Sequence, residues 1–137
     1  MRKVVLISCV SRKLAHPARA QDLYISPLFR LNLAYAKSLS PDAVYILSAA
    51  HGLVELHRKL APYNETLNTK KDAEIRTWAD KVMKKLSVMS DPRHDEFVFL
   101  AGERYRRHLV PKLARVRIPL EGLGLGRQLQ LLKRATA

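Results

Sequence analysis

The sequence predicts one α/β domain over residues 1–137, in which helices cover both faces of a mainly parallel, four-stranded sheet in three layers. Three observations support this fold class. Apolar runs of strand length alternate with helical patterns along the chain. The first run, 4–9, shows no alternation of polar and apolar residues, which is typical of a strand buried on both faces. Each run ends in small or polar residues, and parallel strands bring these ends to one edge, where open α/β sheets bind ligands.

The first half of the chain contains two predicted strands. Residues 4–9 form the first, and a loop-like segment follows over 11–21. A helix begins at Ser26-Pro27, because Ser is a good N-cap and Pro fits the first helical position, and it ends before Ser40-Pro41. Residues 43–47 form the second strand. The stretch 53–67 looks irregular, and ordered loops of that length are usually functional.

The second half contains two helix–strand pairs and a last helix. A helix begins at Thr69 or Lys70 and ends at Ser90-Asp91-Pro92, with a third strand over 96–100. A short helix over 103–113 is interrupted by Pro111. The fourth strand, 116–120, contains Pro119 and is expected near an edge of the sheet, where proline is tolerated. The final helix covers about 127–134.

The charge of the chain favours a polyanionic partner. There are 25 Lys and Arg against 12 Asp and Glu, so the formal net charge is +13, and the pI is near 10.3. We expect nucleic acid or a nucleotide as the partner, with an anionic membrane surface as the second choice. The alternative is a charge that serves only solubility or reflects a bias of the source proteome.

Several classes of protein are disfavoured. A single cysteine excludes an internal disulfide and fits a reducing cytoplasm. No group of Cys and His has the spacing of metal ligands, so a metal site is not expected. No cofactor is expected either. The first apolar run is too short to span a membrane and has no signal-peptide cleavage region. We therefore expect a cytoplasmic protein that does not act in a membrane.

The end of the first strand, Ser8 to Lys13, offers hydroxyls, backbone amides and two cations. These groups suit a phosphate or the carbonyl edge of a base. Arg12 and Lys13 are candidate phosphate ligands, Ser11 a candidate catalytic residue and Cys9 a candidate base contact. The alternative is a solvated turn with a buried thiol. A nucleophilic Cys9 is disfavoured because no histidine neighbours it in the sequence.

The second strand leads into His51, a candidate general acid or base, and Gly52, a candidate base contact that lets the backbone approach a ligand. The alternative for His51 is a cap of the next element. Tyr63 and Asn64 follow in the irregular stretch and offer an aromatic face and an amide for a base. Their alternative role is to anchor a packed loop.

The last two strand ends add cations, glycines and a carboxylate. Arg106 is a candidate phosphate ligand, as are Gly122, Gly126 and Arg127, because backbone amides before a helix can hold an anion. The alternative is a solvated basic face. Glu121 is the candidate catalytic carboxylate, since its turn is otherwise apolar and glycine-rich and its pKa could rise there. Glu55 is the other carboxylate considered for orienting water.

With these motifs in view, the chain resembles DUF6884-like proteins, a family of bacterial, archaeal and phage proteins without an agreed activity. The resemblance covers essentially the whole chain and rests on Cys9-Val10-Ser11-Arg12-Lys13, Leu23-Tyr24-Ile25-Ser26-Pro27-Leu28-Phe29, Leu47-Ser48-Ala49-Ala50-His51-Gly52-Leu53, Pro62-Tyr63-Asn64-Glu65-Thr66-Leu67 and Pro119-Leu120-Glu121-Gly122-Leu123-Gly124-Leu125-Gly126. In the first motif Val10 separates Cys9 from Ser11, whereas serine directly follows cysteine in the commoner Cys-Ser-x-x-Lys.

More remotely, the motif order is similar to that of peroxide-stress YaaA proteins and of a domain of archaeosine synthases. This similarity implies a fold like that of uracil-DNA glycosylases and a role in DNA repair or base modification. The first hypothesis is N-glycosidic hydrolysis in DNA, with DNA favoured over RNA and the base held in a pocket. The alternatives are a non-catalytic module that binds or protects DNA, and an enzyme that acts on a small nucleotide.

Overall fold

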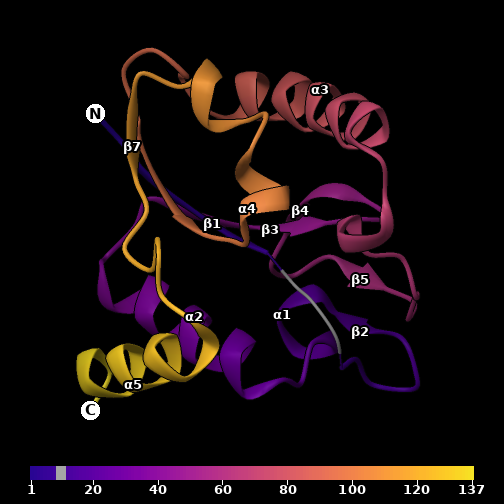
Figure 1. Ribbon diagram of the computed structural model, residues 1–137, viewed down its shortest axis with the longest axis vertical. Coiled ribbons are helices and arrows are strands. Elements are labelled where there is room, and N and C mark those ends of the chain that lie inside the picture. The colour runs from indigo at the N-terminus through magenta and orange to yellow at the C-terminus, as the bar shows by residue number, and fades with distance from the viewer. Residues whose placement is uncertain (9–11) are drawn as a thin grey trace.

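The centre of the molecule is a five-stranded sheet, and the computed structural model describes residues 1–8 and 12–137 (Figure 1). Its strands are β1 (Lys3–Ser8), β3 (Ala43–Ser48), β4 (Gly52–Glu55), β6 (Glu96–Leu100) and β7 (Arg115–Arg117). They lie in the order β4-β3-β1-β6-β7. Only β4 is antiparallel to its neighbour. The mainly parallel sheet is confirmed, and the expected number of four strands is wrong.

The fifth strand, β4, lies in the stretch that was expected to be irregular. After β3 the chain turns back at Gly52, whose φ of +71° lies in the left-handed region that favours glycine. Leu53 and Val54 follow and are buried in the cores on opposite faces of the sheet. One glycine and two apolar residues are too short a pattern to distinguish such a strand from a loop.

Helices cover both faces of the sheet (Figure 1). One face carries α2 (Pro27–Ser38) and α5 (Leu125–Ala135), and the other carries α3 (Asp72–Met89) and α4 (Glu103–Arg106). Side chains of β1 alternate between the two cores, with Val5 and Ile7 in one and Val4 and Leu6 in the other. Burial on both faces explains why this strand is apolar throughout.

Local chemistry sets where α2 begins, but not where α4 ends. Ser26 caps α2 as expected, and its Oγ accepts a hydrogen bond from the Phe29 backbone N–H at 3.2 Å. The helix expected over 103–113 is shorter in the structure. α4 ends at Arg106, and the residues around Pro111 form only a 3₁₀ turn, η2 (Val110–Lys112). None of the helices in the described part of the chain is long and apolar enough to cross a lipid bilayer.

Small elements occupy segments that were expected to be loops. They are β2 (Ala18–Arg19), α1 (Ala20–Leu23), β5 (Lys59–Leu60) and the 3₁₀ turn η1 (Leu67–Thr69). β2 and β5 form a separate two-stranded antiparallel sheet, in which Ala18 pairs with Leu60. Strands of two residues are stabilised by pairing across the fold, so they leave no periodic pattern in the sequence.

The chain path creates a switch point between β1 and β6. From β1 the chain crosses through α2 to β3, on one side of β1, and from β4 it crosses through α3 to β6, on the other side. The two crossover helices lie on opposite faces of the sheet (Figure 1). The carboxyl ends of β1 and β6 therefore diverge into different layers, which is where open α/β sheets form a ligand crevice.

Candidate functional site

A cavity of about 370 Å³ lies at this switch point, and we call it the switch-point cavity. The ends of β1 and β6, the first turns of α2, α4 and α5, and the loop after β7 surround it. Its apolar wall contains Leu28, Phe29, Phe99, Leu120 and Leu123, and its polar side chains include Ser8, Asn32, Asn68, Glu103, Arg106 and Gln128. Apolar walls with a few convergent polar groups are the usual composition of a small-ligand site.

Asn32 is the polar residue of this cavity with an unmet hydrogen-bonding need. It lies on the buried side of α2 with Phe29 and Ala36, and only 4% of the residue is exposed. Its Oδ1 is buried and has no hydrogen-bond partner in the described part of the structure. A buried acceptor without a partner is costly, because it has lost its water and gained nothing in return. An N–H donor from a ligand would remove this cost.

Arg106 places a cation in the cavity wall. Its side chain is 16% exposed, and Nη1 donates to the Ala101 carbonyl at 2.8 Å. Nη2 lies 3.8 Å from the carboxylate of Glu121, a side chain that is 64% exposed at the rim. The backbone here is fixed by Ser8, whose Oγ accepts a hydrogen bond from the Gly102 N–H at 3.1 Å. The guanidinium is thus held by the end of β6.

Glu103 is the carboxylate that lines the switch-point cavity. Arg107 donates to both of its oxygens, with N–O distances of 2.6 to 3.1 Å. These hydrogen bonds hold the pKa of Glu103 below its ordinary value. The group therefore stays ionised at neutral pH, so it can stabilise positive charge or orient a water molecule, but it is a poor proton donor.

His51 belongs to a second cavity, which we call the His51 cavity. This cavity has a volume of about 520 Å³ and lies between the β3–β4 turn, the segment around η1 and α3. Partial burial of the ring, and then the positive charge of Arg58, lower the pKa of His51 from its ordinary 6.5, while Glu65 acts in the opposite direction. His51 is therefore neutral at neutral pH and suited to accept a proton.

Three hydroxyl groups form a chain from Ser48 at the end of β3 through Tyr63 to Tyr24. Ser48 Oγ donates to the Tyr63 hydroxyl at 2.8 Å, and that hydroxyl lies 2.6 Å from the hydroxyl of Tyr24. The His51 ring contacts Tyr63 edge-on, with 5.3 Å between centroids, and Lys13 Nζ lies 4.4 Å from the Tyr63 centroid. The fold thus brings Lys13, His51 and Tyr63 together beside β3.

The remaining candidate residues do not share one cavity. Gly52 forms the turn and lines the His51 cavity, while Gly122 lines the switch-point cavity. Arg127 faces a shallow hollow beside Leu123 and Tyr35, and Gly126 lies exposed in the first turn of α5.

Five candidate residues from the sequence remain. Arg12 and Asn64 are exposed, and Glu55 lies 3.3 Å from His57; none of these three lines either cavity. Cys9 and Ser11 lie outside the described residues.

Sequence reasoning did not find Asn32 or Gln128. A signal for Asn32 was present, because an amide occupied the otherwise apolar stripe of α2 formed by Phe29, Asn32 and Ala36. A polar residue on a buried helix face needs a partner, and the sequence contained no indication of which one. Gln128 follows the glycine-rich turn and donates through Nε2 to the Leu123 carbonyl at 2.8 Å.

Comparison with known proteins agrees with the resemblance of the motifs. A model of the family described as "Family of unknown function (DUF6884)" matches residues 4–134. A relative from Bacillus subtilis (strain 168), "Uncharacterized protein YfjM", is 32% identical over 146 residues, which cover 98% of this chain and 95% of that protein. No solved structure matches the chain significantly.

Proposed function

We propose that this chain, which belongs to the DUF6884 family of unknown function, binds a nucleobase of a nucleic acid or nucleotide in its switch-point cavity. One observation carries the proposal, namely the buried Asn32 oxygen without a described partner beside apolar walls at the switch point. Every common base has a flat apolar ring and a polar edge, and asparagine pairs with such edges through its amide.

The surroundings of Asn32 fit a base with an attached phosphate. A volume of about 370 Å³ is within the range of small-ligand pockets. Phe29 and Leu123 offer apolar contacts for a ring, and Arg106 offers a fixed cation for a phosphate or for the carbonyl of a base. The net charge of +13 favours the approach of a polyanion from solution.

The second candidate function is N-glycosidic hydrolysis in DNA, with a fold like that of uracil-DNA glycosylases. The ionised Glu103 in the cavity favours it, because cleavage of the bond develops positive charge on the sugar and requires an oriented water. Glu121 at the rim is the alternative carboxylate. His51 would take part only through a ligand that extends into the second cavity.

Titration of the protein with the four deoxynucleoside monophosphates tests the binding proposal. Asn32→Leu replaces the amide by an apolar side chain of similar size and is expected to weaken binding at least about tenfold, since one buried hydrogen bond is lost. Asn64→Leu changes an exposed amide outside both cavities, and binding should persist. Equal binding by wild type and Asn32→Leu, or no binding by wild type, would contradict the proposal.

Incubation with DNA that carries varied base lesions and modifications, followed by alkali, tests the catalytic candidate. Alkali-labile sites that appear with wild type and are lost with Glu103→Gln would support hydrolysis. Binding of the DNA without cleavage across the panel would instead identify a module that binds DNA without acting on it.

A further inference from the structure

We infer that the ligand is a single-stranded polynucleotide, and that the His51 cavity binds the phosphate of a nucleotide next to the one whose base occupies the switch-point cavity. This inference rests on the proposed function and names the class of its ligand. It depends on how the two cavities adjoin and on the charges of the second one.

The two cavities lie on either side of η1. Asn68 lines the switch-point cavity, whereas the preceding residue, Leu67, lines the His51 cavity. Tyr105 holds this turn in place, because its hydroxyl accepts a hydrogen bond from the Leu67 N–H at 3.3 Å. The Tyr105 ring, in the wall of the first cavity, packs edge-on against Trp78 of the second, with 5.8 Å between centroids. A single-stranded nucleic acid that crosses η1 therefore reaches both cavities.

Three lysines line the His51 cavity, and two of them already have partners. Lys85 Nζ donates to the Leu53 carbonyl at 2.9 Å, and Lys70 Nζ lies 3.8 Å from Glu65. Lys81 is exposed on α3 and forms no ion pair with any described residue. Its ammonium is thus available to an anion from outside.

The carboxylates of this cavity are also engaged. Glu65 lies beside Lys70, and Glu74 accepts a hydrogen bond from the Lys71 backbone N–H at 3.2 Å, at the start of α3. Neither carboxylate forms an ion pair with Lys81. A phosphate is the anion that a polynucleotide brings to this position.

A mononucleotide occupies only the switch-point cavity, whereas a polynucleotide strand occupies both cavities. The second contact then forms without a new loss of translational freedom, so the strand binds more tightly than its monomer. Each phosphate contact of a single strand also makes the slope of log affinity against log salt more negative by about 0.7.

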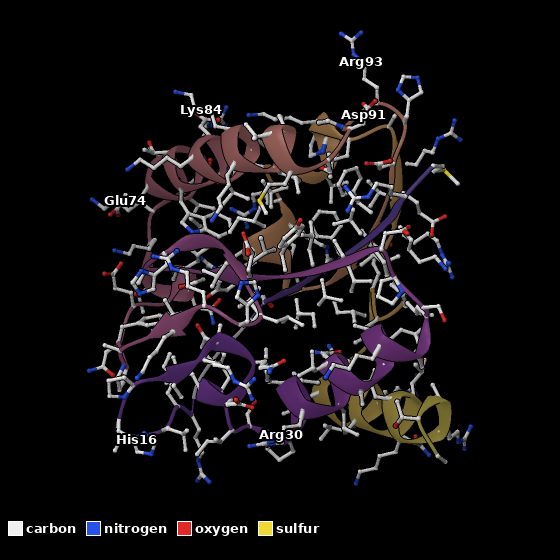
Figure 2. The ribbon with its side chains drawn as sticks, turned by 180° about the vertical axis from the view of Figure 1, so that it is seen from behind. His16, Arg30, Glu74, Lys84, Asp91 and Arg93 are labelled. Atoms are coloured by element: carbon white, nitrogen blue, oxygen red, sulfur yellow. The ribbon has the colours of Figure 1, made fainter. Side chains whose placement is uncertain are left out.

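The test measures fluorescence anisotropy with a labelled single-stranded DNA of about 12 nucleotides that contains all four bases. Mononucleotide affinities are measured in parallel. The variant is Lys81→Ala, and the matched control is Lys84→Ala, because Lys84 lies on the same helix, is exposed and points away from the sheet, as Figure 2 shows.

We expect the DNA to bind at least about tenfold more tightly than any mononucleotide, an advantage typical of linked contacts. Lys81→Ala should lower DNA affinity about three- to tenfold and make the negative slope of log affinity against log salt shallower by about 0.7. Mononucleotide binding should not change. Lys84→Ala should have a clearly smaller effect on DNA. Equal effects of the two substitutions, or DNA affinity no higher than that of mononucleotides, would overturn the inference.

The experiment separates this inference from the proposed function. If Asn32→Leu abolishes mononucleotide binding but Lys81→Ala and Lys84→Ala have equal effects on DNA binding, the base site is supported and the phosphate site is rejected. No binding of either ligand rejects both. If Lys81→Ala weakens DNA binding but Asn32→Leu does not affect it, the base site is rejected and only the phosphate contact is supported.

Discussion

The phenolic oxygens of Tyr24 and Tyr63 lie 2.6 Å apart, and Tyr63 also accepts a hydrogen bond from Ser48 Oγ at 2.8 Å. This chain of hydroxyls links the end of α1, the loop after β5 and the carboxyl end of β3. Tyr24 and Ser48 are fully buried, so these hydrogen bonds replace water that neither residue can reach. They hold in place the ring that His51 contacts.

Tyr63→Phe should lower the free energy of unfolding by about 1–3 kcal/mol. The substitution keeps the ring but leaves the buried hydroxyls of Ser48 and Tyr24 without this partner. Denaturant titration measures the change. Tyr35→Phe is the control, because no hydrogen bond to the half-buried Tyr35 hydroxyl occurs in the described part of the structure, and its effect should stay within about 0.5 kcal/mol. Equal effects of the two substitutions would show that the hydroxyl chain contributes nothing.

Asn32→Leu should leave the unliganded protein as stable as wild type, or more stable by up to about 1 kcal/mol. It removes a buried oxygen that has no partner among the described residues and fills the same space with apolar atoms. The midpoint of thermal unfolding without ligand measures this. A loss of more than about 2 kcal/mol would show that the amide is a structural group rather than a ligand contact.

Gly52→Ala and Gly126→Ala should change stability in opposite directions. Gly52 has a φ of +71°, so an alanine there is strained by about 1–2 kcal/mol, although its Cβ would make only ordinary contact with Val82 at 3.6 Å. Gly126 lies in the first turn of α5, and a Cβ there meets nothing within 4 Å. Alanine at that position should stabilise the helix by about 0.4–1 kcal/mol. Chemical denaturation measures the free energy of unfolding of both variants. A Gly52→Ala variant as stable as wild type would mean that the β3–β4 turn tolerates another geometry.

The carboxyl group of Asp72 should titrate far below its ordinary range. Hydrogen bonds from His108 Nε2 at 2.8 Å, and then from Arg107 Nη1 at 2.9 Å, lower its pKa from 3.8 to about 2. Because the folded value is the lower one, its contribution to stability is present above pH 3.8 and is lost as pH falls through about 2.

NMR titration of side-chain carboxyl signals measures this pKa directly. His108→Ala should raise the pKa of Asp72. The pKa of Asp91, which hydrogen bonds from the Arg93 backbone N–H and then from His94 hold low, should not change. An ordinary pKa for Asp72 in wild type would contradict the arrangement of these three side chains.

Local patterns were sufficient for several elements of the fold. The unbroken apolar character of β1 indicated burial on both faces, and Val4 and Val5 indeed enter different cores. Ser26 and Pro27 located the start of α2. Such features depend on neighbours within a few residues, so the sequence displays them directly.

Local patterns were insufficient for β4 and for α4. The antiparallel return after β3 depends on the conformation of Gly52 and on burial of the next two residues, and the early end of α4 depends on how the chain packs before Pro111. In both segments the tertiary contacts decide between conformations that the local sequence permits almost equally.

The sequence by itself determined the α/β class, the shared edge of the four parallel strands and the basic charge of this protein. Only the tertiary structure decided that β6 lies beside β1, which creates the switch-point cavity, and that His51 lies in another cavity from Arg106 and Gly122. It also decided that the Asn32 oxygen has no described partner. Periodicity shows which way a side chain faces, whereas strand order and the partners of buried polar atoms are set by contacts between distant parts of the chain.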